Sequence, residues 1–380
     1  MKEAAIPSWE ITPSQSTHAV KIPVRKSVLV WWSMLPVGFA LVMTFPAILP
    51  VQYMFDAGII RELIIQGNRP TGLSIGDPFA NTAYLYMLAG VGANPQAAAF
   101  FTYLVAWASV LMGILLASNG GRYWLWFPAF IWHAILVVFT CMHTKEMHSM
   151  PALALMLLLA GTRFTWWRVI ALGVVIAGYA GYFRMYWLLA GMLTLAFIVS
   201  RRRIRRSSLL ALAMFASYLL LFVGYHVITG EFLTDVRAHL TAGRDIDLFS
   251  DSLFANFFVN GDLYDDIANA LFALGRLIMP VGLIGTGKLQ HLAFAVWEAL
   301  NVGVFVVLFA RVWRRRETDA RTEFAAAWVL AFTLIQAIFE PDYGSFLRHQ
   351  TALLPAFAML ALNAFWSREG RPFPVRSRAD

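Results

Sequence analysis

An arginine and a histidine stand side by side at Arg348-His349, immediately before the last long apolar stretch of the chain. The arginine can donate two parallel hydrogen bonds to phosphate oxygens. The histidine, with an ordinary pKa of about 6.5, can accept a proton at neutral pH. An arginine reaching lipid headgroups and a histidine bonded to the backbone would explain the pair as well. Because Glu340 and Asp342 lie just upstream, we keep Arg348 as a candidate substrate ligand and His349 as a candidate base at a helix start.

A second polar group lies in a short connection, where Thr144-Lys145-Glu146 is flanked by His143 and His148. Adjacent residues do not share a helix face, but the lysine, the glutamate and the first histidine could still converge on a pocket. The two histidines are five residues apart, which does not match the spacing of four that a helical zinc site needs. We therefore expect Lys145 to bind substrate, Glu146 to be a candidate catalytic residue, and no metal to be bound.

A third candidate is the segment Tyr182-Phe183-Arg184-Met185-Tyr186. An arginine between aromatic residues suits a pyrophosphate, and the aromatic rings suit stacking on a sugar. The alternative is the usual belt of aromatic residues at a membrane boundary. We take Arg184 and Tyr186 as candidate substrate-binding residues.

Carboxylates supply further candidates. Asp56 and the pair Asp265-Asp266 could act as bases or bind a metal, although most carboxylates in loops are simply solvated; of these, Asp56 is retained as a candidate catalytic residue. His133 and Glu298 lie inside apolar stretches, where ionisable residues are rare and often functional. A buried, hydrogen-bonded structural role explains each of them equally well.

The composition indicates the environment in which these residues work. The chain has 380 residues, of which 59% are hydrophobic and only 14% are charged, and its mean hydropathy is +0.63. Soluble domains are about one-quarter charged, so we expect an all-α, polytopic bundle of transmembrane helices. The net charge of +8 comes from arginines at the ends of apolar stretches, as in membrane proteins, and nucleic-acid binding is not expected. The single cysteine, Cys141, excludes a disulfide framework.

The apolar stretches predict about ten spans with both termini in the cytoplasm. We expect a cytoplasmic tail over 1–26, a single transmembrane domain over 27–366 with two long outer loops at about 54–97 and 229–266, and a second cytoplasmic tail over 367–380. The segment 267–287 could cross the membrane or lie flat. We favour the flat arrangement because it keeps the two arginine runs on one side. The expected spans are 27–53, 98–118, 124–141, 150–162, 169–182, 185–200, 208–228, 290–310, 323–339 and 350–366.

The order of these features resembles the bacterial polymerases of exopolysaccharides and O-antigens (the Wzy-like group), with some similarity to lipid-linked C-type glycosyltransferases. Three short motifs, spread over the whole chain, carry the resemblance: Thr144-Lys145-Glu146, Tyr182-Phe183-Arg184-Met185-Tyr186, and Gly344-Ser345-Phe346-Leu347-Arg348-His349 through Leu354-Pro355. The resemblance implies an inner-membrane polysaccharide polymerase of exopolysaccharide biosynthesis. Such an enzyme transfers a glycan from a polyprenyl-pyrophosphate carrier to an acceptor sugar at the periplasmic face, and Arg184, Arg348 and His349 would be its site residues.

The partners expected on this basis are the polyprenyl-pyrophosphate-linked oligosaccharide, the lipid bilayer, and flippase and chain-length or export proteins. We expect no cofactor. C-type enzymes usually show an acidic pair in the first outer loop, which here has only Asp56, Glu62 and Asp77. Three alternatives stay open: a C-type transferase that adds a single sugar from a polyprenyl-phosphate donor, a transporter or flippase of lipid-linked glycans, and a purely structural membrane subunit. A transporter should show an internal repeat, and we find no clear one.

Overall fold

The fold is all-helical in a computed structural model that describes residues 26–49, 54–66, 70, 72–117, 126–242, 253, 255–314 and 318–366. Within these residues the helices are joined by turns, and a single antiparallel bridge between Leu253 and Asp342 is the one extended pairing. The expected tails, apart from Lys26, and parts of both expected outer loops lie outside the described residues. The all-α prediction is therefore confirmed for the described part of the chain.

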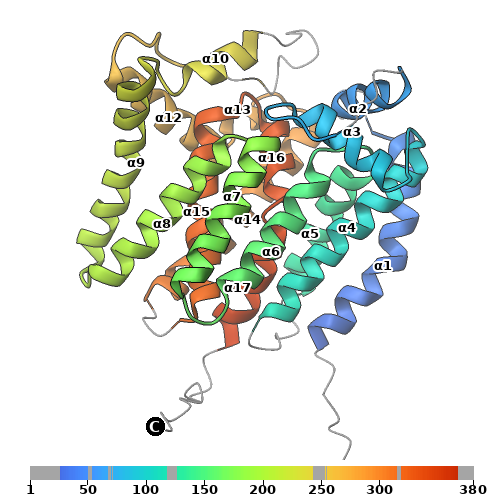
Figure 1. The fold of residues 1–380 in the computed structure, drawn as a ribbon, viewed down its shortest axis with the longest axis horizontal. Coiled ribbons are helices and arrows are strands. Elements are labelled where there is room, and N and C mark those ends of the chain that lie inside the picture. The colour runs from blue at the N-terminus through green and yellow to red at the C-terminus, as the bar shows by residue number, and fades with distance from the viewer. Residues whose placement is uncertain are drawn as a thin grey trace, which may run out of the picture.

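Most of the longer helices run side by side between two ends of a bundle, and shorter helices cover one of those ends (Figure 1). The bundle consists of α1 (Lys26–Thr44), α4 (Pro95–Leu116), α5 (Trp126–Thr140), α6 (Glu146–Ala160), α7 (Trp166–Tyr182), α8 (Tyr186–Arg203), α9 (Ser207–Thr229), α14 (Leu289–Arg314), α15 (Ala320–Phe339) and α17 (Leu354–Trp366). The covering elements are η1 (Phe45–Ala47), α2 (Phe55–Ile65), α3 (Pro78–Leu88), α10 (Asp235–Ala242), α12 (Leu263–Ile278), α13 (Val281–Ile284) and α16 (Tyr343–Thr351).

One end of the bundle carries the arginine runs, and we call it the arginine end. There Arg201 of α8 donates from Nη2 to the backbone oxygen of Val312 at 3.1 Å and to Thr318 at 2.9 Å. This contact joins the last turns of α8 and α14 to the start of α15. Arg321 then donates to the last carbonyls of α4 and α6, those of Leu116 and Leu157. These hydrogen bonds satisfy carbonyl groups that a helix C-terminus leaves without partners.

The opposite end, which we call the site end, holds the segments that connect α9 to α14. Both α12 and α13 lie at this end (Figure 1), where Ala273, Leu277 and Leu283 pack against Ala337 near the end of α15. The segment 230–288 therefore begins and ends on the same side of the bundle. In the described residues α8 and α14 therefore both end at the arginine end, with Arg201, Arg202 and Arg203 in the last turn of α8 and Arg311 and Arg314 in the last turn of α14.

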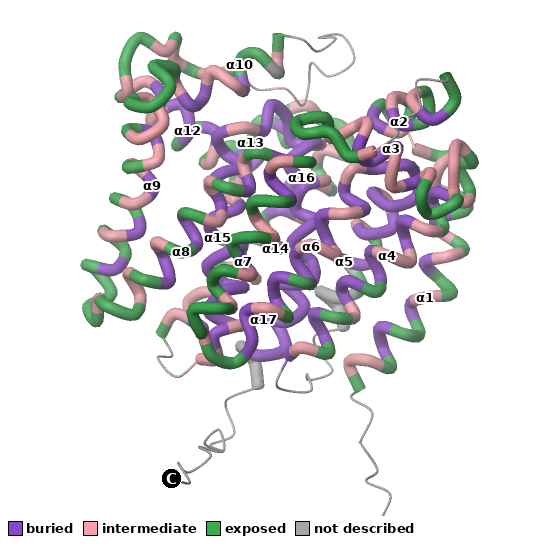
Figure 2. The backbone as a smooth tube through the Cα atoms, viewed as in Figure 1, coloured by how far each residue is buried: buried purple, intermediate pink, exposed green. Residues whose placement is uncertain are grey.

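Five helices of the described part of the chain are long and apolar enough to cross a membrane: Lys26–Ala47, Pro95–Leu116, Ser207–Thr229, His291–Arg314 and Ala320–Phe339. Their burial differs widely. Only 17% of the apolar window of α9 is buried inside the protein, whereas 78% of the window of α15 is buried. Figure 2 shows the same contrast, with exposed positions along α9 and mostly buried positions in the centre of the bundle. Exposed apolar helix faces of this kind suit a lipid environment, so the chain is a membrane-embedded protein.

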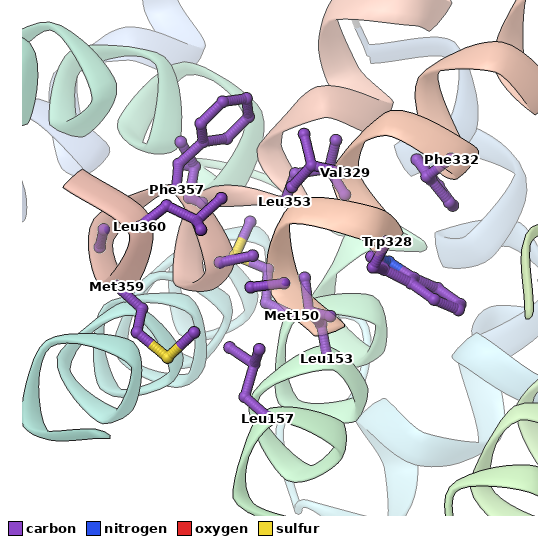
Figure 3. Packing of buried hydrophobic residues seen from close by; sticks show 14 of the residues in the cluster. Met150, Leu153, Leu157, Trp328, Val329, Phe332, Leu353, Phe357, Met359 and Leu360 are labelled. Carbon is purple, nitrogen blue, oxygen red and sulfur yellow. The ribbon is translucent and has the colours of Figure 1, made fainter. Parts of the chain in front are cut away.

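The centre of the bundle is formed where α6, α15 and α17 meet. Leu153 and Leu157 of α6, Trp328 of α15 and Phe357 of α17 belong to one buried apolar cluster (Figure 3). Helix α4 reaches α17 closely at Gly113, where a β-carbon would overlap the backbone oxygen of Pro355. Small residues at such crossings allow helix backbones to approach in membranes. This packing holds the first turn of α6 and the last turn of α15 in fixed positions at the site end.

Several helix boundaries differ from the expectation. Helix α6 begins at Glu146, four residues before the expected start of that span, and α14 continues to Arg314, four residues beyond the expected end. The expected span over 350–366 begins within α16, and α17 itself begins at Leu354. Asp342 starts α16 because its side chain accepts a hydrogen bond from the backbone nitrogen of Ser345 at 2.6 Å, and Pro355, which has no N–H group, stands in the first turn of α17. Arg348 and His349 therefore lie in the last turn of α16, and the prediction that they start a helix is wrong.

Candidate functional site

Charged side chains from five parts of the chain meet at the site end. We call this group the charged cluster; its members are Asp56 of α2, Lys145 and Glu146 at the start of α6, Arg184 between α7 and α8, Glu340 at the end of α15, and Arg348 and His349 of α16. Tyr186 adjoins it through a hydrogen bond from Arg184 at 2.5 Å. All seven site residues expected from the sequence thus lie together, although their chemical roles stay predictions.

Asp56 joins two cations. Its Oδ2 lies 2.6 Å from Nη1 of Arg348 and 3.1 Å from Nζ of Lys145. Burial alone would raise the pKa of the Asp56 carboxyl, but Arg348 and Lys145 outweigh burial and hold that pKa well below its usual range. Asp56 is consequently an ionised carboxylate over the whole physiological range of pH, and such a carboxylate is a weak base.

Lys145 is the cation whose charge is easiest to remove. Burial lowers the pKa of its amine to about 8, although Asp56 works in the opposite direction. The ammonium group also lies over the ring of Phe79, 4.0 Å from the ring centre. A lysine in this state carries its charge at neutral pH and loses it under mildly alkaline conditions.

Glu146 joins the other arginine to the histidine. Its Oε1 accepts a hydrogen bond from Nη2 of Arg184 at 2.6 Å, and Nε of Arg348 and Nε2 of His349 each lie 3.6 Å from the same oxygen. The side chain of Glu146 is only 1% exposed. Its position in the first turn of α6 is favourable for a negative charge because the N-terminus of a helix carries a partial positive charge.

His349 is oriented by a carboxylate that the site prediction did not include. Its Nδ1 is hydrogen-bonded to Oε1 of Glu340. Burial lowers the pKa of His349 well below the ordinary value, and the nearby Arg184 lowers it further. A neutral imidazole that donates from Nδ1 to a carboxylate keeps a lone pair on Nε2. Nε2 is thus a proton acceptor that faces the centre of the cluster.

The polar side chains around the cluster have structural partners. His143, expected to converge with Lys145, instead bonds through Nε2 to the backbone oxygen of Gly92 at 3.0 Å. His148 is held between Tyr179 and Thr82, at 3.0 and 2.9 Å. The structure therefore separates both histidines from the charged cluster.

The other carboxylates and intramembrane residues also lie elsewhere. Asp266 accepts hydrogen bonds from the backbone nitrogens of Leu233 and Thr234 at 2.9 and 2.8 Å, which orders the loop after α9. His133 bonds to Tyr103 at 2.8 Å, and Glu298 accepts from the side chain of Gln350 at 3.0 Å. The structural explanation accounts for these contacts, and none of these residues contributes to the cluster.

The cluster combines two chemical capacities. Three cations, on Lys145, Arg184 and Arg348, offer donors that suit an anion with several oxygens, and Nε of Arg348 has no hydrogen-bond partner among the described residues. Nε2 of His349 offers a proton acceptor beside them. Within the described part of the chain, no group of three His, Cys, Asp or Glu side chains is placed to hold a metal ion; two of the cluster's carboxylates face cations and the third faces His349.

Glu340 is the residue that reasoning from the sequence undervalued. It ends α15 and is followed by Pro341, so the chain turns directly into α16 and brings His349 back against it. The signal was the short acidic segment between two apolar stretches, Glu340-Pro341-Asp342. That signal places acidic residues near Arg348 but cannot indicate which of them meets the imidazole.

Comparison with known proteins gives no identification: no protein-family model, no curated protein and no solved structure matches the chain.

Proposed function

We propose that ten helices of the bundle cross a bacterial inner membrane, with the arginine end in the cytoplasm and the site end in the periplasm. The support is the distribution of charge: the arginine runs of α8 and α14 lie at one end, together with the start of α1, and basic residues are retained on the cytoplasmic side. In this orientation both long connections, and the charged cluster, face the periplasm.

Within that orientation the cluster lies below the outer surface. Helix α6 has 15 residues, which corresponds to about 22 Å, whereas the hydrocarbon core is about 30 Å thick. A site at the start of a short helix is close to the lipid phase and to water at once. This position suits a substrate that has a polyprenyl tail in the membrane and a glycan outside it.

The function that these features support best is that of a polysaccharide polymerase, which transfers a glycan from a polyprenyl-pyrophosphate carrier to an acceptor sugar. The observation that carries the proposal is the convergence of Arg184, Arg348 and Lys145 beside Nε2 of His349, which lies 3.6 Å from Oε1 of Glu146. A diphosphate leaving group needs clustered cations, and an attacking hydroxyl needs a proton acceptor.

The reaction can be written with these residues. An acceptor hydroxyl attacks the anomeric carbon of the donor, and its proton passes to Nε2 of His349. The bond between that carbon and the diphosphate oxygen breaks, and the electron pair leaves with the polyprenyl pyrophosphate. Arg184 and Arg348 stabilise the charge on the departing diphosphate. We assign the base to His349 rather than to Asp56, since the Asp56 carboxylate is bound to two cations.

The test is a transfer assay on the purified full-length protein in lipid nanodiscs, supplied with lipid-linked repeat units. We expect a ladder of extended glycans from the wild type and loss of the ladder from Arg184→Ala and Arg348→Ala. Arg61→Ala, which removes an exposed arginine of α2, is the matched control and should retain the ladder. Addition of one sugar only would indicate the single-sugar transferase, and passage of the intact lipid across the bilayer without transfer would indicate a transporter. Normal ladders from both cluster variants would contradict the proposal.

A further inference from the structure

Asp56 occupies the place between two cations that an anionic ligand would take. One oxygen of its carboxylate, Oδ2, contacts both Arg348 and Lys145, at 2.6 and 3.1 Å. Arg184 is not part of this arrangement, because Glu146 and Tyr186 hold its guanidinium. The pair of cations around Asp56 is therefore a subsite with a carboxylate already in it, and it adjoins Arg184 because Arg184 and Arg348 both lie near Oε1 of Glu146.

The charge balance of the cluster explains why the position of Asp56 matters for anion binding. Three cations face three carboxylates, those of Asp56, Glu146 and Glu340, so the cluster is balanced when it is empty. A diphosphate ester brings two or more negative charges into a largely desolvated place. Uncompensated buried charge is costly, so an anion can bind tightly only where a resident carboxylate gives up its cations.

Of the three carboxylates, Asp56 is the one that can most easily move away from its cations. Its side chain is 11% exposed, against 1% for Glu146 and 3% for Glu340. Glu146 belongs to α6 in the middle of the bundle, and Glu340 is bonded to His349. Asp56 instead belongs to α2, a short helix that lies beside α3 outside the main bundle (Figure 1).

The movement that the displacement needs is confined to the aspartate side chain. Ile60 and Ile64 of α2 pack with Ala83 of α3 in an apolar cluster that also includes Met147 of α6, and Ala57 of α2 packs against the central cluster. Helix α2 is therefore anchored to the bundle, and rotation of the Asp56 side chain alone would free Lys145 and Arg348.

We propose that Asp56 is an internal competitor for the donor: the diphosphate of a prenyl-linked substrate binds Lys145 and Arg348 by displacing the Asp56 carboxylate. This inference rests on the proposed function and specifies its substrate subsite. Nε of Arg348, which has no hydrogen-bond partner among the described residues, supplies an additional donor for the incoming oxygens. Asp56 then keeps the two cations charged and in position while no donor is bound.

The experiment measures anion binding directly. The full-length protein in nanodiscs is titrated by calorimetry with inorganic pyrophosphate and, separately, with a short prenyl diphosphate, in the wild type and in Asp56→Ala. Asp56→Ala removes the carboxylate that competes for Arg348 and Lys145, so both ligands should bind this variant about tenfold or more tightly than the wild type. Asp56→Asn, which keeps the shape but not the charge, should tighten it by less. Glu62→Ala removes the same charge from an exposed position of the same helix and should leave binding nearly unchanged.

The competitor role of Asp56 and the proposed function can fail independently in this experiment. If pyrophosphate and prenyl diphosphate bind the wild type, and Asp56→Ala weakens both as Arg348→Ala does, Asp56 is a supporting residue and the inference is wrong, while the proposed function stands. Equal tightening in Asp56→Ala and Glu62→Ala would also overturn it, because the effect would be one of general charge. If no variant binds either ligand, the anion subsite itself is absent and the proposed function fails as well.

Discussion

Glu340 and His349 form a hydrogen-bonded pair across the turn that joins α15 to α16, and the imidazole presents its other nitrogen to the charged cluster. The carboxylate at Nδ1 fixes which ring nitrogen carries the proton, and it also favours the imidazolium that forms when Nε2 accepts a second one. Glu340 is thus a positioning residue for the proposed base.

The pair can be tested by substitution and by pH. His349→Gln should lower turnover by about 10²- to 10⁴-fold, the usual contribution of a general base, and Glu340→Gln by about ten- to a hundredfold. The KM for the lipid-linked donor should change little. Because the pKa of His349 is well below its ordinary value, the imidazole is neutral and able to accept a proton at every pH above that low value. Wild-type turnover should therefore stay level from about pH 6 to 8, whereas an ordinary histidine would lose half of it near 6.5. Wild-type rates in both variants would make the histidine structural.

The titration of Lys145 should make ligand binding depend on pH, although turnover through His349 should not. Its amine, with a pKa of about 8, is charged below that pH and neutral above it. Binding of pyrophosphate should weaken as the pH rises through 8. The Lys145→Arg variant keeps its positive charge and should bind pyrophosphate equally well below and above pH 8. Parallel curves for the two proteins, measured by calorimetry at matched pH, would show that another group is responsible.

The proposed orientation can be examined by single-cysteine labelling in a Cys141→Ser background. Tyr264→Cys lies at an exposed position of α12 at the site end, and Arg203→Cys is exposed in the last turn of α8. In intact spheroplasts a membrane-impermeant maleimide should label position 264 and leave position 203 unlabelled until the membrane is opened. Labelling of 203 and not 264 from outside would reverse the topology, and labelling of both from outside would contradict the single crossing by α9 that the proposal puts between them.

Gly113 predicts a stability effect that is independent of function. In Gly113→Ala the new β-carbon meets the backbone oxygen of Pro355, so α4 and α17 must move apart. We expect the free energy of unfolding to fall by about 1–3 kcal/mol. Gly173→Ala, in α7, meets nothing within 4 Å and is the matched control, expected to change stability little. Unfolding in detergent mixtures measures both, and equal stability of the two variants would indicate that the crossing is loosely packed.

The helical fold and the two ends could be predicted from the sequence, because hydropathy and arginine position act over whole segments. Helix boundaries depend on single residues and were harder to predict from the sequence. Asp342 starts α16 through one side-chain hydrogen bond, so a short helix forms before the last apolar stretch, where composition predicts only a loop. The same local effect moves Arg348 and His349 from a helix start to a helix end.

The members of the charged cluster could be named from residue type, but their pairing could not be predicted. Asp56 contacts Arg348 across 292 positions of sequence, and nothing local to either residue indicates that contact. The expected pKa of His349 was also wrong, since it assumed an ordinary environment and the imidazole is buried beside Arg184. Burial and distant contacts arise only when the helices pack.

The distance along the chain between Asp56 and Arg348 has a consequence for biosynthesis. Helices leave the ribosome in order, so Asp56, Lys145, Glu146 and Arg184 enter the membrane while the last helices are still being made. During that interval the nascent protein holds an incomplete set of charges at the site end. A product that terminates before α16 lacks the arginine that binds Asp56, and of the two cations that contact this carboxylate in the described residues it keeps only Lys145.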